Sequence, residues 1–247
     1  MTLSEEQQES YRQKGYLKIE HVFDAEEINA WDVESKRLLK VGLGKDDNSR
    51  LAMYRTPVGL SVIDRINPVI DISTVFRAVV EDQRIRSPLR ELYKDHMILF
   101  KDKIIYKMPG VPGYNMHQDY SSWQRFPLDL ANVIVSIDGA DAKNGGVEFF
   151  PGHHHALLSP PGELRYMNND EAAQIDMSSG EIIETGAGDM VIFDSLTPHR
   201  SGINQSNRLR RQLYLTYSSA RNGDMYQAQL DYMKEVNSRK RSVTVVG

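Results

Sequence analysis

The sequence predicts a mainly β fold, a jelly roll (double-stranded β-helix) with helices packed on its outside, in one domain over residues 1–247. Apolar residues recur with a helical period at first and with a period near 2 after residue 96. Pro-Gly, Gly-Gly and Gly-Ala-Gly turns divide the second part, as is typical of short antiparallel strands. We expect residues 1–95 to be a mostly helical flank, 96–220 the jelly-roll core, and 221–247 a C-terminal helix and tail.

The N-terminal flank contains two sequence patterns that mark helix starts. Ser4 with Gln7, and Asp24 with Glu27, have the spacing of a capping box, in which each side chain satisfies a backbone N–H of the first turn. Residues 16–22 between them are expected to be extended. The chain should therefore begin with a helix, a short extended piece and a second helix.

From residue 63 to residue 95 the pattern remains helical, and Ser87-Pro88 is expected to start a new helix. Residues 155–180 are polar with little periodicity, which is typical of a lid or insertion. Residues 225–236 are expected to form a closing helix. The predicted strands, which alternate apolar and polar residues, are 97–108, 130–137, 146–150, 182–185, 189–193 and 211–218.

Composition excludes several classes of site. The chain has no cysteine, so disulfides, thiolate zinc sites and iron–sulfur clusters are excluded, and any metal must be held by nitrogen and oxygen. The net charge of -4 argues against nucleic acid as a partner. No apolar run approaches the roughly 18 residues of a membrane span. The polar residues 1–15 lack the features of a signal peptide, so we expect a cytoplasmic protein.

Three residues have the types and spacing of a metal site. His117 and Asp119 lie beside a strand-rich segment, where residues i and i+2 project from the same face. His199 follows the predicted strand 189–193 after a short turn. Two histidines and one carboxylate form the facial triad of non-haem Fe(II) oxygenases. A His-x-Asp pair alone is more often part of a surface loop, so this interpretation depends on the residues after His199.

The stretch after His199 resembles the phytanoyl-CoA dioxygenase-like family. The family's distal motif is a His, a Ser two residues later, an Asn, and an Arg eleven positions after the His, and Ser201 and Arg210 stand at those places. Residues 144–154, NGGVEFFPGHH, resemble another family pattern, and residues 4–30 resemble its usual opening. Similar segments thus extend from residue 4 to about residue 218. Locally, the HQDYSSW stretch that begins at His117 is most similar to ectoine hydroxylase-type members.

The resemblance implies an Fe(II)- and 2-oxoglutarate-dependent dioxygenase that uses O2 to hydroxylate a small-molecule substrate, releasing succinate and CO2. It implies iron on the His117, Asp119 and His199 triad. Arg210 and Ser201 are then expected to bind the distal carboxylate of 2-oxoglutarate. A guanidinium forms a bidentate, charge-assisted pair with a carboxylate, and a hydroxyl adds a donor. The likeness also implies Tyr106 as a group that touches 2-oxoglutarate.

For the substrate, the likeness suggests Trp123, Phe193 and Tyr214 as pocket walls, although large aromatics fit an ordinary core equally well. Arg200 replaces the glycine common after the distal His, and we expect it near the pocket mouth, where it would suit an anion. The chain is short for the family. A small polar metabolite (amino-acid-like, a phosphonate or a natural-product intermediate) therefore fits better than an acyl-CoA.

Alternatives remain open from the sequence. Asp119 argues against halide transfer, because related halogenases need a vacant position where this carboxylate binds. Hydroxylation, desaturation, cyclisation and demethylation are not separated, and a non-catalytic cupin-like binding protein would keep the same fold. Arg208 and Arg211 are interpreted as solvated charges. The His153–His155 run is interpreted as a surface turn, because three consecutive side chains cannot all face one ion.

Overall fold

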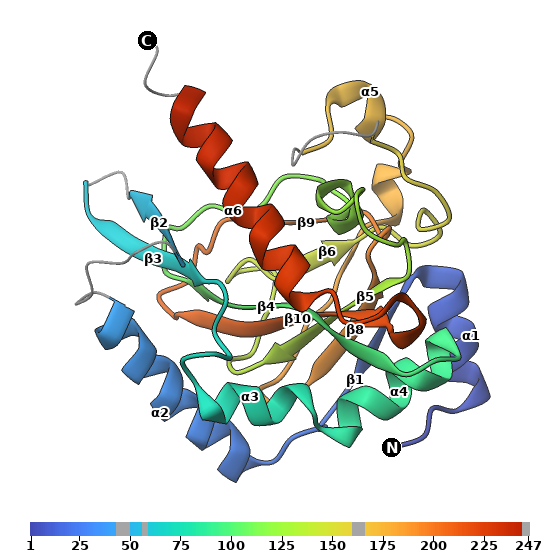
Figure 1. Ribbon diagram of the computed structural model, residues 1–247, viewed down its shortest axis with the longest axis horizontal. Coiled ribbons are helices and arrows are strands. Elements are labelled where there is room, and N and C mark those ends of the chain that lie inside the picture. The colour runs from blue at the N-terminus through green and yellow to red at the C-terminus, as the bar shows by residue number, and fades with distance from the viewer. Residues whose placement is uncertain (43–49, 56–58, 160–165, 244–247) are drawn as a thin grey trace.

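The computed structural model in Figure 1 describes residues 1–42, 50–55, 59–159 and 166–243, and its two antiparallel sheets confirm the predicted jelly-roll class. The larger sheet has the strand order β1-β8-β5-β10-β4-β3-β2, and the smaller has the order β7-β6-β9. The strands are β1 (Tyr16–Ile19), β2 (Leu51–Arg55), β3 (Ser61–Ile66), β4 (Met97–Lys107), β5 (Leu130–Ser136), β6 (Val147–Phe149), β7 (Glu181–Ile182), β8 (Met190–Asp194), β9 (His199–Ser201) and β10 (Arg210–Ser219).

Helices cover one face of the larger sheet. The α-helices are α1 (Glu5–Lys14), α2 (Ala25–Gly42), α3 (Thr74–Val80), α4 (Gln83–Tyr93), α5 (Asn169–Ala172) and α6 (Tyr226–Val243), and short 3-10 turns are η1 (Asp119–Ser122), η2 (Met177–Ser179) and η3 (Ala220–Asn222). In Figure 1, α2, α3 and α4 lie along the lower side of the sheet. The main apolar core lies there, where Trp31 and Phe76 pack with sheet residues such as Leu213. Burial of these side chains stabilises the fold by about 1.5–3 kcal/mol each.

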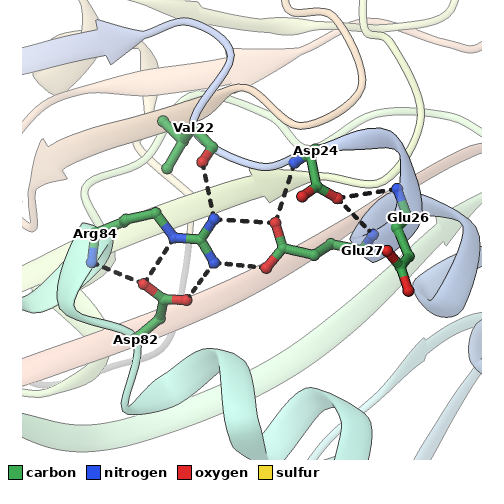
Figure 2. Close-up of polar contacts among 6 residues, drawn as sticks. All are labelled: Val22, Asp24, Glu26, Glu27, Asp82 and Arg84. Carbon is green, nitrogen blue, oxygen red and sulfur yellow. Dashed lines mark hydrogen bonds and ion pairs between the residues drawn. The ribbon is translucent and has the colours of Figure 1, made fainter.

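The predicted capping boxes are both present. Ser4 and Gln7 exchange hydrogen bonds at the start of α1. Figure 2 shows the second box, where the Asp24 carboxylate accepts from the backbone N–H of Glu27 and the Glu27 carboxylate accepts from that of Asp24. The Arg84 guanidinium of α4 donates to Glu27 at 2.5 Å and to Asp82, the N-cap of α4, at 2.6 Å. This cluster therefore joins the N-terminal ends of α2 and α4.

Two predictions for residues 63–95 are wrong. Residues 61–66 form strand β3 instead of continuing a helix. Ile63 and Ile66 are both buried and lie three positions apart, a helical spacing. The register between β2 and β3 shifts at this point, so that Asp64 is an extra residue and both isoleucines reach one face. Helix α4 begins at Gln83, and Pro88 lies inside it instead of starting a new helix. The described part of residues 1–95 thus contains four helices and three strands.

The other face of the larger sheet is mostly polar along β4 and β10 and apolar along β5 and β8. Along β4 and β10 the side chains alternate, and Arg210 pairs with Lys107, Gln212 with Ile105 and Tyr214 with Lys103. These residues point toward the smaller sheet, whose Val147 and Phe149 pack on the inner faces of β5 and β8. A polar interior between two sheets gives the fold room for a ligand.

The C-terminal helix is longer than predicted, since α6 extends to Val243. It crosses in front of β4 in Figure 1. No helix in the described part of the chain combines the length and apolarity that a membrane span requires.

Candidate active site

Backbone pairing places the two histidines opposite each other. The extended segment that ends at His117 runs antiparallel to β9, and His117 and His199 exchange backbone hydrogen bonds at 3.0 Å in both directions. Gly113 lies in this segment because a Cβ there would fall 1.6 Å from the carbonyl oxygen of Ser201. Asp119 follows as the first residue of η1. Main-chain contacts thus fix the spacing of all three predicted ligands.

The three side chains converge. One ligand atom from each of His117, Asp119 and His199 lies within 4.8 Å of the others, the only such group in the part of the chain that the structure describes. The Nδ1 atoms of His117 and His199 contact the carbonyl oxygens of Asn115 at 2.7 Å and Thr197 at 2.9 Å. Each Nδ1 is therefore the donor, and each Nε2 keeps its lone pair for a metal.

The protonation states suit a divalent cation. Burial, followed by the neighbouring His199, lowers the pKa of His117 to about 3, so this imidazole is neutral at pH 7. Burial alone would raise the pKa of Asp119, but His199, Lys103, His117 and Lys101 together lower it to about 2. Metal ligands must be deprotonated, and this set meets that requirement.

The triad lines a cavity of about 320 Å³. Its wall also carries Arg65, Lys101, Lys103 and Arg200, and Asp119 is the only carboxylate on it among the described residues. The cavity is therefore cationic. Arg65 and Arg200 have carboxylate partners behind the wall, Asp64 at 3.0 Å and Glu148 at 2.5 Å respectively.

A second cationic group lies behind Ser201. Arg210 and Lys107 face each other across the β10–β4 ladder and are each 1% exposed. The Lys107 ammonium donates to Ser201 Oγ at 3.1 Å, and Ser201 Oγ also accepts from the Tyr114 N–H, so the Ser201 hydrogen is free to donate. Arg210 donates to Gln212, but its Nε is buried without a partner among the described residues. Two buried cations and an orphaned donor fit a bound carboxylate.

The fold and the triad agree with the comparisons to known proteins. The profile of the phytanoyl-CoA dioxygenase (PhyH) family matches residues 11–212. The chain belongs to this family. Among curated relatives, it is 27% identical to a methylphosphonate hydroxylase from Gimesia maris over 91% of this chain and 84% of that protein. It is 29% identical to a 2-aminoethylphosphonate dioxygenase from an uncultured bacterium, over 72% of this chain and 66% of that protein.

A solved structure matches the same architecture. EctD from S. alaskensis, crystallised with 2-oxoglutarate and 5-hydroxyectoine, superimposes with a TM-score of 0.78 at 19% identity, covering 89% of this chain and 77% of that one. At this identity the match shows the fold, which is the jelly roll already described. The PhyH family and the named dioxygenase relatives together make this chain a 2-oxoglutarate-dependent dioxygenase.

Four predicted contact residues of this PhyH-family chain lie at or directly behind the cavity. Ser201, Tyr214 and Arg200 line it, and Arg210 is positioned behind Ser201. Arg200 forms an ion pair with Glu148 and lies over the Phe150 ring at 5.3 Å.

Tyr106 does not contact the cavity, contrary to the prediction. It lies on the helix-facing side of β4, is fully buried, and donates its hydroxyl to the backbone oxygen of Ser35 in α2. The cause is strand alternation, because the neighbouring Lys107 points inward and Tyr106 must point outward. Tyr106 therefore anchors α2 to the sheet.

Trp123 and Phe193 are also absent from the cavity wall. Trp123 is buried in a separate aromatic cluster, where its ring meets Phe100 edge-on at 5.2 Å. Phe193 packs edge-on against the His199 imidazole, with ring centroids 5.0 Å apart, and so supports that ligand from behind. Both aromatics belong to the core, the alternative that the sequence left open.

Arg211 is not a solvated charge either. It is 7% exposed, faces the helices and forms ion pairs with Asp32 and Asp138 at 2.8 and 2.7 Å. Arg208 is exposed, as predicted. The His153–His155 run follows a turn at residues 151–152, and His155 is exposed whereas His153 and His154 are partly buried. Part of the predicted lid, residues 160–165, falls outside the described residues, and Tyr166 beside it lines the cavity.

Sequence reasoning missed the cations on β4. Lys101, Lys103 and Lys107 are separated by two and four residues along β4, and side chains an even number of residues apart project from the same face of a strand. The three lysines therefore share the inward face. Gln118, between His117 and Asp119, projects away from the triad. It is fully buried, donates to the backbone oxygens of Ala156 and Leu196, and accepts from the N–H of Leu158.

Proposed function

We propose that this chain binds Fe(II) and 2-oxoglutarate and hydroxylates a small anionic metabolite, with phosphonates as the favoured class. The observation that carries the proposal is one cavity lined both by the His117, Asp119 and His199 triad and by Lys101 and Lys103, two cations without a carboxylate within 4.0 Å among the described residues. The curated relatives named above act on methylphosphonate and 2-aminoethylphosphonate, which supports the choice of class.

The triad would hold the iron, because two neutral imidazoles and one ionised carboxylate leave three positions open for other ligands. Arg210, Lys107 and Ser201 would bind the distal carboxylate of 2-oxoglutarate, since they offer two charges and a free hydroxyl hydrogen in a buried place. Bound iron with 2-oxoglutarate supplies the oxidation: one oxygen atom of O2 enters a C–H bond of the substrate, the other enters succinate, and CO2 leaves.

The chain's own residues then position the reactants. Tyr214 and Arg200 border the space that a substrate would fill, and Phe193 and Thr197 hold the His199 ring in its orientation. Gln118 connects the triad segment to residues 156–158, so that the loop beside the cavity is fixed to the metal ligands.

An anaerobic titration tests the proposal. Fe(II) and 2-oxoglutarate should together give a weak visible band near ~500 nm, as expected for a metal with open positions that binds a keto acid. Adding O2 with methylphosphonate or 2-aminoethylphosphonate should release succinate faster than O2 alone, with a hydroxylated product detected by mass spectrometry. A missing band together with no succinate would point instead to a cupin-like binding protein.

A further inference from the structure

Two lysines of the cavity wall differ from its other cations. Lys101 and Lys103 are alternate residues of β4, they lie opposite Thr216 and Tyr214 of β10, and both line the cavity that contains the triad. Arg65 and Arg200 of the same wall are each neutralised by a carboxylate. Neither lysine forms a hydrogen bond or has a carboxylate within 4.0 Å in the described part of the chain.

Among the residues that the structure describes, the only close partners of these ammonium groups are aromatic rings. Lys101 Nζ lies 4.6 Å from the centroid of the Trp123 ring, and Lys103 Nζ lies 5.0 Å from that of Tyr214. Such contacts orient a lysine and stabilise it modestly, but they add no negative charge. Asp119 is the carboxylate that acts most strongly on both lysines, and it is one of the three predicted metal ligands.

The ammonium groups of Lys101 and Lys103 repel each other in the folded chain. Burial, and then the neighbouring Lys103, lowers the pKa of Lys101 to about 7, and burial also lowers the pKa of Lys103. Unpaired ammonium groups in a partly desolvated wall are costly to the fold. An arrangement of this kind is expected where an anionic ligand completes the charge balance.

We propose that Lys101 and Lys103 form the subsite that binds the oxyanion group of the substrate, and that the preferred group is a phosphonate-type dianion. The inference rests on the proposed function and adds which residues select the substrate. Each ammonium offers three donors, so the pair can contact several oxygens of a tetrahedral group. A dianion balances both charges, whereas a carboxylate balances one.

This subsite also explains how a small substrate would be presented to the triad. The lysines and the triad line the same cavity of about 320 Å³, so an anion held on β4 keeps its short carbon substituent inside the space that the triad borders. The 2-oxoglutarate contacts would lie elsewhere, at Arg210 and Lys107 toward the other end of the β4–β10 ladder.

Binding measurements on the full chain test the inference. Methylphosphonate is titrated by calorimetry into wild-type protein loaded anaerobically with Fe(II) and 2-oxoglutarate, with acetate as the single-charge comparison. Lys101→Met and Lys103→Met remove the ammonium and keep an unbranched stem. Each should weaken methylphosphonate binding about 10- to 100-fold, the usual effect of losing a charge-assisted hydrogen bond. Lys18→Met, at a half-buried lysine of β1 that pairs with Glu20 and Asp189, is the matched control and should change binding less than 2-fold.

Three further readouts separate the possible results. The visible band with 2-oxoglutarate should persist in both variants, and thermal unfolding should confirm that they fold. Lys103→Arg should retain binding within about 5-fold, because it keeps the charge. Equal binding by wild type and both Met variants overturns the inference, and so does equal loss in Lys103→Arg and Lys103→Met. A band without any methylphosphonate binding refutes the subsite alone, whereas a missing band refutes the proposed function.

Discussion

Replacing Arg210 with methionine should separate ligand binding from stability, because the structure gives the two effects opposite signs. Arg210 and Lys107 are two cations, each 1% exposed, on directly opposed positions of β10 and β4. Burial and the nearby Arg210 lower the pKa of Lys107 to about 7. The substitution removes one buried charge and one like-charge contact, so the free energy of unfolding without ligand should stay constant or rise by about 1 kcal/mol.

The affinity for 2-oxoglutarate should fall in the same variant. Truncating one partner of a buried, hydrogen-bonded charge pair costs about 2–5 kcal/mol. Lys107 and Ser201 remain to hold the carboxylate, so the lower end of that range applies. A loss of about 2–3 kcal/mol corresponds to a roughly 30- to 150-fold rise in the dissociation constant of 2-oxoglutarate.

Both quantities can be measured on one preparation. The dissociation constant comes from anaerobic titration of the visible metal–2-oxoglutarate band, and the stability from urea unfolding of the protein without ligand. Arg208→Met is the matched control, because Arg208 lies two residues away, is exposed, and pairs with Asp141 at 2.6 Å. An unchanged 2-oxoglutarate affinity in Arg210→Met would refute the assigned role. A large loss of stability would refute the like-charge argument.

Three more predictions follow from single contacts. Asp119→Ala leaves two of the three converging ligands, so anaerobically loaded protein should lose its iron on desalting; retention of iron measured by metal analysis would contradict the triad. Gln118→Leu leaves the buried backbone partners of Gln118 without a hydrogen bond, so the free energy of unfolding in urea should fall by about 2–4 kcal/mol. A change under about 0.5 kcal/mol would show that those hydrogen bonds are dispensable. Burial raises the pKa of Asp194 to about 6, so the folded chain retains a proton that the unfolded chain releases near pH 4. The stability that this group contributes should therefore fall, by on the order of 1–3 kcal/mol, as pH rises from about 4 to about 6. Unfolding curves at about pH 4.5 and 7.5 measure this fall, and Asp194→Asn should abolish it.

The sequence predicted what depends on local spacing. The capping residues Ser4 and Asp24 start helices because their hydrogen bonds close within four residues. The fold class followed from the change of hydrophobic period near residue 96. Strand β3 was not predicted because its irregular register places Ile63 and Ile66 on one face at helical spacing. The bulge that causes this register depends on the partner strand β2. Such long-range information is not present in the local pattern.

The candidate site was predicted in the same uneven way. The triad, Ser201 and Arg210 were predicted from family motifs, and the structure brings the three triad side chains together and joins Ser201 to Lys107, the residue opposite Arg210. Among the aromatic residues, Tyr214 lines the cavity, whereas Trp123 and Phe193 do not, because a large aromatic has the same sequence pattern whether it lines a cavity or fills a core. Their assignment needs the positions of neighbours such as Phe100, which lie far away in sequence.

The remaining errors share one physical cause, the side of the sheet that a residue faces. On β4, Tyr106 points to the helices and Lys107 to the interior, and on β10, Arg211 points to the helices and Arg210 to the interior. A shift of one residue along a strand therefore moves a side chain from the helix-facing side, where it anchors a helix, to the interior, where it would contact a ligand. The antiparallel register that pairs Arg210 with Lys107 and Tyr214 with Lys103 fixes that phase for both strands at once. Once Arg210 is assigned to the interior, the same alternation requires Lys107, Lys103 and Lys101 to face inward, which makes the cationic wall a consequence of the register of one strand pair.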